Sequence, residues 1–193
     1  MNLSPRVWLA AALATCVPLL AVGATPGSTM RWADLLDRPR PTADMRIAYG
    51  PDPLQFADLW LPKAKAPHPV VLMVHGGCWQ TGIAEADIMN YIADALRSRG
   101  IAVWNIEYRG VDRAGGGYPG TFLDVAAAAD ALKKAGRRYR LRTGRVVALG
   151  HSAGGHLALW LAARNRIARA DPLHAGKPLP IAAAISIGGL PDL

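Results

Sequence analysis

A pentapeptide that could supply a nucleophile stands at Gly150-His151-Ser152-Ala153-Gly154. It follows an apolar run, residues 146–149, and precedes a stretch of helical composition, so the sequence predicts a sharp strand-turn-helix. Gly150 and Gly154 are needed there because a side chain at either place would collide with the neighbouring strand or helix. Such a turn lifts the serine hydroxyl above the sheet, where it can attack a carbonyl carbon. Ser152 is therefore the predicted nucleophile.

A second glycine-rich segment, His75-Gly76-Gly77-Cys78-Trp79, follows another apolar run. Glycines such as Gly76 and Gly77 let the backbone approach a substrate closely and turn its N–H groups inward. The amides of Gly77, Cys78 and Ala153 are the predicted donors to an oxyanion, and each such donor is typically worth ~3 kcal/mol to the transition state. We interpret His75 as a brace for this loop and not as a catalyst.

The elements that must position these two loops alternate between strand and helix patterns from Met45 onward. Strands are expected at 45–49, 55–61, 69–75, 101–108, 145–149 and 181–187, and helices at 84–99, 121–135 and 153–164. Strands that alternate with helices of about 15 residues predict βαβ units. The fold class is therefore α/β, with a mostly parallel sheet and flanking helices, over an incomplete domain at 45–193.

The two predicted helices that precede the pentapeptide carry apolar faces and glycine stop signals. The predicted buried face of the first comprises Ile88, Ile92, Ala95 and Leu96, and Gly100 is expected to end that helix. The second is expected to bury Phe122, Val125, Ala126, Ala129 and Leu132 and to end at Gly136. The glycine-rich stretch at 110–117 matches no phosphate-binding pattern, so we interpret it as a flexible turn.

The two glycine-rich motifs together resemble an esterase group of the α/β-hydrolase superfamily, which includes BD-FAE-like (feruloyl-esterase-like) hydrolases and kynurenine formamidase. Further similar stretches are Glu107-Tyr108-Arg109, Tyr118-Pro119, Asp124-Val125 and the final segment 187–193. The resemblance covers residues 55–193. It implies an α/β-hydrolase fold and hydrolysis of a small carboxylic ester through an acyl-enzyme on Ser152.

The sequence departs from that family at its end. In this fold the triad follows the order Ser, then Asp or Glu, then His, and only 41 residues (153–193) follow Ser152. His174 is the one free candidate for a base and Asp192 the one late candidate for an acid, and we expect neither to act. The triad acid and histidine are therefore expected to be missing. We expect the chain to be truncated after the strand at 181–187 and to be nearly inactive. That strand is expected to form an exposed edge of the sheet.

The N-terminal residues predict export. Residues 1–24 combine one positive charge, an apolar run and a small-residue site at Ala24, which is typical of a cleaved signal peptide that leaves no stable membrane insertion. An uncleaved anchor remains the alternative. Residues 25–44 are interpreted as a linker or arm. Of the two cysteines, Cys16 would be lost with the signal, so Cys78 is expected to have no disulfide partner.

The net charge of +8 raises the question of nucleic-acid binding. Seven of the basic residues lie between Lys133 and Arg145 with little aromatic interleaving, which favours a solvated surface over a nucleic-acid site. No metal-ligand cluster or cofactor motif is present in the sequence, and oligomeric state stays open. The alternatives to an esterase are an arylformamidase acting on a formylated amine and a secreted, non-catalytic remnant.

Overall fold

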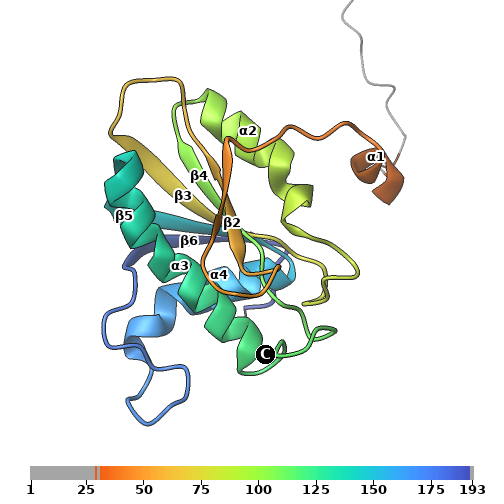
Figure 1. Ribbon diagram of the computed structural model, residues 1–193. Coiled ribbons are helices and arrows are strands. Elements are labelled where there is room, and N and C mark those ends of the chain that lie inside the picture. The colour runs from red at the N-terminus through yellow and green to blue at the C-terminus, as the bar shows by residue number, and fades with distance from the viewer. Residues whose placement is uncertain (1–28, 30, 192–193) are drawn as a thin grey trace, which may run out of the picture.

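The structure, a computed structural model, describes residue 29 and residues 31–191, which form one six-stranded sheet with helices on both faces (Figure 1). The strands are β1 (Met45–Ala48), β2 (Phe56–Trp60), β3 (His68–Val74), β4 (Ala102–Ile106), β5 (Leu141–His151) and β6 (Ile181–Ile187). The helices are α1 (Trp32–Leu36), α2 (Asn90–Ser98), α3 (Gly120–Tyr139) and α4 (Ala153–Ala163), with 3-10 turns η1 (Ala86–Met89) and η2 (Arg164–Arg166).

The sheet is mixed but mostly parallel, as the alternation of strands and helices predicts. Its order is β1-β2-β4-β3-β5-β6, in which β1 and β2 are antiparallel neighbours and β2 meets β4 antiparallel. The remaining pairs, β4 with β3, β3 with β5 and β5 with β6, are parallel. Because parallel strands end at the same edge, the loops that follow β3, β4 and β5 share one edge of the sheet.

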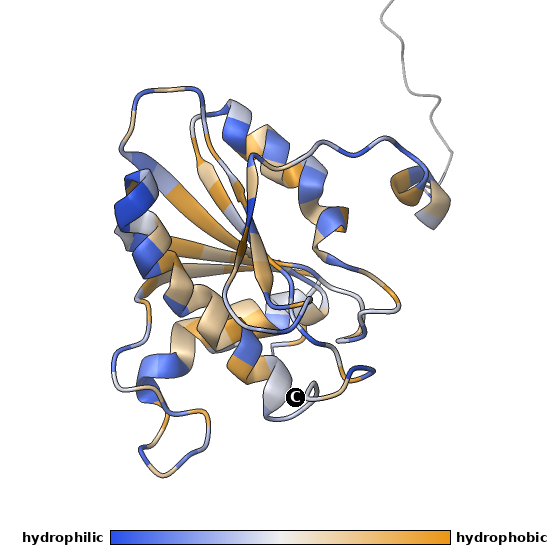
Figure 2. Ribbon diagram, viewed as in Figure 1, coloured by the Kyte–Doolittle hydropathy of each residue, from blue (hydrophilic) through white to orange (hydrophobic). Residues whose placement is uncertain are grey.

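Alternate side chains of the central strands fill two cores, one on each face of the sheet. Leu72 and Trp104 point to the face that α3 and α4 cover, where Leu132 and Leu157 meet them. Met73 and Val103 point to the other face, where η1 and α2 supply the partners. Apolar residues in Figure 2 accordingly concentrate on the strands, while polar residues lie on the outer surfaces of the helices.

Both helices before the pentapeptide differ in detail from their prediction. The helix expected at 84–99 begins with the 3-10 turn η1, and its buried side chains include Ile88, Met89 and Ala93, whereas Ile92 and Ala95 are exposed. The helix expected to stop at Gly136 continues to Tyr139 and ends where Arg140 adopts a positive φ of 56°. Gly136 lies where a side chain would collide with Thr143, so the glycine serves close packing on β5.

The expected strand at 181–187 is confirmed as an edge. As β6 it pairs with β5 along one side only, within the described residues. Ile185 and Ile187 are both close to half exposed, in contrast to the fully buried β2 and β4. Parallel strands of α/β sheets are normally covered on both faces, so the exposed apolar side chains of β6 are unusual.

The segment before β1 contains the short helix α1 and lies against α2. Arg40 pairs with Asp87, and the Tyr91 hydroxyl donates to the Pro39 carbonyl at 2.9 Å. The signal peptide expected at residues 1–24 lies outside the described residues.

A buried ion pair fastens the segment that leads into β6. The Arg164 side chain is only 2% exposed, and its Nη2 donates to Asp130 of α3 at 2.8 Å. Asp130 also accepts the backbone N–H of Leu179 at 2.7 Å and pairs with Lys133 at 2.9 Å. Burial acts to raise the pKa of Asp130, but the hydrogen bonds from Arg164 and Lys133 outweigh it and lower that pKa below 3.8.

We expect Asp130→Asn to lower the free energy of unfolding by about 2 kcal/mol at pH 7, since it leaves the buried Arg164 charge without its counter-charge. A carboxyl with a lowered pKa in the folded state stabilises the protein above its unfolded pKa and loses that effect as pH falls through the folded value. The difference from wild type should therefore shrink below pH ~4. Urea unfolding between pH 3 and 7 measures it, with the exposed Asp37→Asn as control; equal losses in both variants would contradict the expectation.

Candidate functional site

Ser152 occupies the turn between β5 and α4 that the sequence predicts. Its backbone has φ 53° and ψ −122°, a conformation that costs a residue other than glycine about 1–3 kcal/mol and persists only where the surroundings enforce it. The Ser152 amide donates to the carbonyl of Ile187 at 2.9 Å, and the Ser152 carbonyl accepts the amide of Gly155 at 2.8 Å. The turn is thus held between the end of β6 and the first turn of α4.

The loop 76–79 after β3 is the second part of the site. Gly77, Cys78 and Trp79 have consecutive positive φ values of 109°, 53° and 56°. Two of these three are not glycines, so this loop also stores backbone strain. Cys78 is exposed and forms no disulfide within the part of the chain that the structure describes.

The loop and the turn are in direct contact because glycines stand where they meet. A Cβ added to Gly76 would lie 3.0 Å from the Ser152 Cβ and 2.7 Å from the His151 carbonyl oxygen. A Cβ added to Gly154 would collide with the carbonyl oxygens of Val74 and His75. The structure therefore brings Gly76, the first residue of the loop 76–79, beside Ser152. Ala153, the first residue of α4, has no amide partner inside its own helix.

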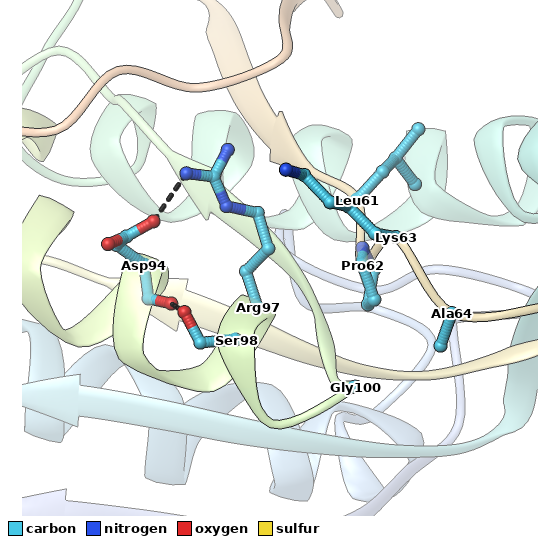
Figure 3. Close-up of a pocket in the computed structure, with 8 residues that line it drawn as sticks. All are labelled: Leu61, Pro62, Lys63, Ala64, Asp94, Arg97, Ser98 and Gly100. Atoms are coloured by element: carbon cyan, nitrogen blue, oxygen red, sulfur yellow. Dashed lines mark hydrogen bonds and ion pairs between the residues drawn. The ribbon is translucent and has the colours of Figure 1, made fainter.

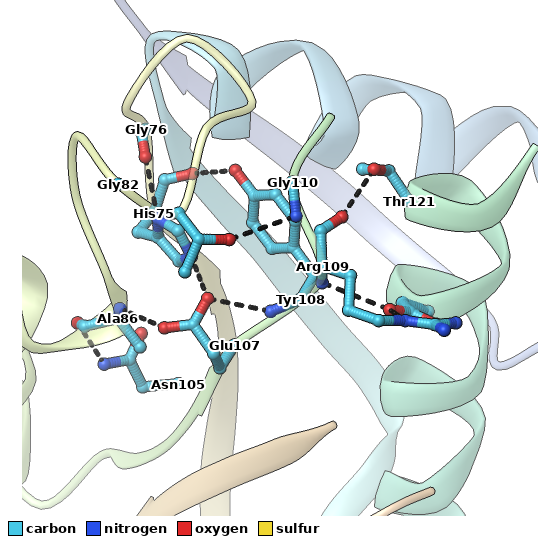
Figure 4. Close-up of polar contacts among 12 residues, drawn as sticks. His75, Gly76, Gly82, Ala86, Asn105, Glu107, Tyr108, Arg109, Gly110 and Thr121 are labelled. Carbon is cyan, nitrogen blue, oxygen red and sulfur yellow. Dashed lines mark hydrogen bonds and ion pairs between the residues drawn. The ribbon is translucent and has the colours of Figure 1, made fainter. Parts of the chain in front are cut away.

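A buried polar cluster lies under the loop 76–79 (Figure 4). His75 Nε2 lies 2.8 Å from the Glu107 carboxylate, and His75 Nδ1 lies 2.7 Å from the Gly76 carbonyl. The Tyr108 ring stacks on the His75 ring at 4.4 Å, and its hydroxyl donates to the His75 carbonyl at 3.0 Å. Burial raises the pKa of Tyr108, so this hydroxyl keeps its proton. The brace assigned to His75 is thus built mainly by residues that follow β4, and their role is not evident from sequence spacing.

The loop after β4, interpreted from sequence as a flexible turn, is hydrogen-bonded to the loop after β3 at its first residues, 110–112. The carboxylate of Asp112 accepts the amides of Thr81 and Gly82, both at 2.9 Å, and the Thr81 hydroxyl accepts the amide of Gly110 at 3.1 Å. The backbone of Val111 donates to the Trp79 carbonyl at 2.7 Å. These bonds tie the loops after β3 and β4 into one surface beside Ser152.

Arg109 and Asp124 join that surface to α3. The guanidinium of Arg109 donates to both oxygens of Asp124, at 2.8 and 2.7 Å, and Gln55 donates to the same carboxylate at 2.7 Å. Asp124 is buried, so the pair forms in low dielectric. The hydroxyl of Thr121, one residue into α3, donates to the Arg109 carbonyl at 2.6 Å.

None of the described histidines is placed to act as a base for Ser152 through an observed hydrogen bond. His75 is engaged with Glu107, and His174 precedes β6, at the edge opposite the end of β5, where its Nδ1 lies 3.0 Å from the Ile167 carbonyl. His156 packs edge-to-face on Trp79, and burial lowers the pKa of its ring. Asp192 lies outside the described residues.

An apolar pocket of about 290 Å³ opens beside the turn, and sequence reasoning missed it. Its walls come from three separate segments and include Trp79, Val111, Tyr118, Phe122 and His156. Phe122 stands edge-to-face with Tyr118, His156 and Trp160. The sequence does carry one signal for this pocket, namely the aromatic residues Tyr118 and Phe122, which follow the predicted end of a strand at residue 108.

Two other hollows differ in position. One of about 200 Å³ lies between α1 and the turn, lined by residues that include Trp32, Ile92, His151 and Ile187. Another, of about 230 Å³, lies between the end of β2 and α2, where Lys63, Arg97 and Ser98 face it (Figure 3). This third hollow is at the opposite edge of the sheet from Ser152 and holds no activated nucleophile.

Two further searches of residue 29 and residues 31–191 gave negative results. No helix there is both long and apolar enough to cross a membrane. No cluster of three or more His, Cys, Asp or Glu residues in that part of the chain could hold a metal ion.

Comparison with known proteins places this geometry among esterases. The chain is 31% identical to esterase LipC of Mycobacterium tuberculosis over 116 residues, which are 58% of this chain and 28% of LipC. A bacterial heroin esterase superposes with a TM-score of 0.56 at 28% identity, covering 68% of this chain and 38% of that one. Esterase B of Lactobacillus rhamnosis gives 0.64 at 25% identity, covering 80% and 52%.

The chain thus spans between about a quarter and a half of the length of these relatives. Their shared architecture confirms the predicted α/β-hydrolase fold. The sequence model of the BD-FAE family matches residues 57–192, which include both glycine-rich motifs and the strands that carry them. On this evidence the chain belongs to the BD-FAE family.

Proposed function

We propose that this chain is the nucleophile-bearing part of a serine hydrolase that cleaves carboxylic esters. The observation that carries the proposal is the strained turn at Ser152 in contact with the glycine loop 76–79. In the reaction, the Ser152 oxygen bonds to the ester carbon, the bond to the alcohol oxygen breaks, and the serine proton passes through a base to the departing alcohol. Water then releases the acid from the acyl-enzyme.

The amides of Gly77, Cys78 and Ala153 are the proposed donors to the oxyanion. They belong to the two segments that meet at Ser152, and the N-terminus of α4 adds partial positive charge on the same side. We further propose that the triad acid and histidine are not among the residues of this chain. Two observations support this: the positions of the described histidines, and the fraction of each relative that the chain spans.

A fluorophosphonate probe tests the nucleophile. We expect slow labelling, because an unassisted serine hydroxyl is a poor nucleophile, and peptide mass spectrometry should map the label to Ser152. The label should be absent in Ser152→Ala and retained in the control Ser98→Ala. For the same reason, the chain should hydrolyse almost no nitrophenyl acetate. Labelling elsewhere, or none at all, would favour a non-catalytic remnant. Rapid Ser152-dependent turnover would place a base within this chain, with His174→Ala as the next variant. An N-formyl aryl amine assayed in parallel covers the arylformamidase alternative.

The apolar pocket lined by Trp79, Phe122 and His156, between the loop 76–79 and α4, is the proposed seat of an uncharged, apolar group of the ester. Replacing Val111, whose side chain lines the pocket and is more than half exposed, by Asp should lower the rate of labelling by an aryl fluorophosphonate about 10-fold, since the probe then meets a charge. A probe with only small alkyl groups should react as before. Ile83→Asp, at a comparably exposed position outside the pocket, is the control. Equal effects of both variants would argue against the assignment.

Export is proposed from residues 1–24, with cleavage after Ala24. Mass spectrometry of the mature protein from the exported fraction should find Thr25 as the first residue, and deletion of residues 1–24 should retain the protein inside the cell. Material that keeps Met1 would indicate an anchor.

A further inference from the structure

The pair formed by His75 and Glu107 is shut off from solvent beneath the loop 76–79. The exposed fractions of the two side chains are 2% and 0%, so water cannot satisfy either group. The carboxylate of Glu107 accepts the amide of Ala86 at 2.7 Å and the amide of Tyr108 at 2.9 Å, besides facing His75 (Figure 4). Three donors, from the residue after β3, from η1 and from the segment after β4, therefore converge on one acid.

The contacts of the pair fix where its protons lie. A carbonyl oxygen can only accept, so His75 Nδ1, at 2.7 Å from the Gly76 carbonyl, must carry a proton. The second nitrogen, Nε2, faces a carboxylate oxygen that already accepts an amide. Two amides directed at the carboxylate favour its ionised form, which can only accept hydrogen bonds. Nε2 must therefore donate to it, so both ring nitrogens carry a proton. The arrangement fits an imidazolium–carboxylate ion pair.

The His75 ring controls the orientation of the next peptide unit. In a trans peptide the C=O and N–H point in opposite directions, so the Gly76 carbonyl and the Gly77 N–H are set together. Because Nδ1 holds the Gly76 carbonyl toward the His75 ring, the Gly77 N–H is turned away from it. The Tyr108 hydroxyl holds the preceding carbonyl, that of His75, in the same way.

The loop needs such an external constraint. Gly77, Cys78 and Trp79 all have positive φ, which the two non-glycine residues would leave if nothing held them. Gly77 and Cys78 are also the two donors that the proposed function assigns to this loop.

We propose that Glu107 is a positioning residue: it holds His75 as an imidazolium, whose bond to the Gly76 carbonyl aims the Gly77 N–H at the oxyanion. The role in catalysis rests on the proposed function, whereas the ion pair and the fixed loop do not. The positive charge of the ring also lies two residues from the Gly77 donor, where it favours a developing negative charge.

Glu107→Gln separates charge from shape. The glutamine oxygen can still accept the Ala86 amide, and its NH₂ can donate to a neutral His75 that keeps its proton on Nδ1, while the Tyr108 amide loses its acceptor, since it bonds the same carboxylate oxygen that faces His75. Asp130→Asn is the control, because it also converts the carboxylate of an ion pair to an amide, here opposite the buried Arg164, but lies at α3, away from the loop.

Three measurements on the full chain test the proposal. Nitrogen-15 NMR of the histidine rings should find both His75 nitrogens protonated in wild type at pH 7 and Nδ1 alone in Glu107→Gln. The Gln80 amide donates to the Gly77 carbonyl at 2.8 Å and the Val111 amide to the Trp79 carbonyl at 2.7 Å, so their hydrogen exchange reports on the loop. Exchange at these two amides should speed up in Glu107→Gln and stay unchanged in Asp130→Asn once the two variants are compared at the same global stability. The first-order rate of Ser152 modification by a saturating fluorophosphonate should fall about 10-fold in Glu107→Gln, with its half-saturating concentration unchanged.

Each result decides the proposal. A neutral His75 ring in wild type, which needs no variant to observe, would overturn the ion pair. The loop amides could exchange, or Ser152 could be labelled, at the same rate in Glu107→Gln as in Asp130→Asn when the two variants are equally stable. Either result would show that Glu107 is only structural and would overturn its positioning role. If wild type is not labelled at Ser152, the proposed function fails, while the ring and exchange measurements still decide whether Glu107 fixes the loop.

Discussion

The parallel pairing of β3 with β5 is the constraint on which the rest of the site depends. It runs in register from Val71 opposite Val147 to Val74 opposite Gly150, so both strands end side by side. The loop after β3 and the turn after β5 must therefore occupy the same small space. Gly76 and Gly154 make that possible, since a side chain at either would press on the backbone of the other segment.

Close backbone approach alone would not keep the two segments in strained conformations. Ser152 is held by β6 and by the first turn of α4, and the loop 76–79 is held by the residues that follow β4. Asp112 is exposed, but His75, Glu107 and Tyr108 are buried and hydrogen-bonded, which strengthens their interactions in a low dielectric. Strain in the loop 76–79 is thus balanced by a cluster centred on Glu107, whose hydrogen bonds go to His75, Ala86 and Tyr108.

The two edges of the sheet are unlike. On the β1 side the sheet ends in an antiparallel hairpin whose partner β2 is completely buried. On the β6 side the strand that supports Ser152 through the Ile187 carbonyl is itself largely exposed. The Arg164–Asp130 pair and the Leu179 amide bond anchor the entrance of β6 to α3, in addition to the pairing of this strand with β5 and the packing of Ile181 against the core.

The sequence by itself determined the α/β class, nearly all strands and helices, and Ser152 with the loop 75–79. These features depend on local patterns: apolar runs, helical periodicity and glycines at fixed offsets within five residues. Tertiary structure alone decided which face of α2 is buried, that α3 continues through Gly136, and that Glu107 braces the loop. It also decided that residues from three segments enclose an apolar pocket. Those features arise from contacts between residues far apart in the chain, whose partners are set by how the strands pair, and no local pattern encodes that pairing.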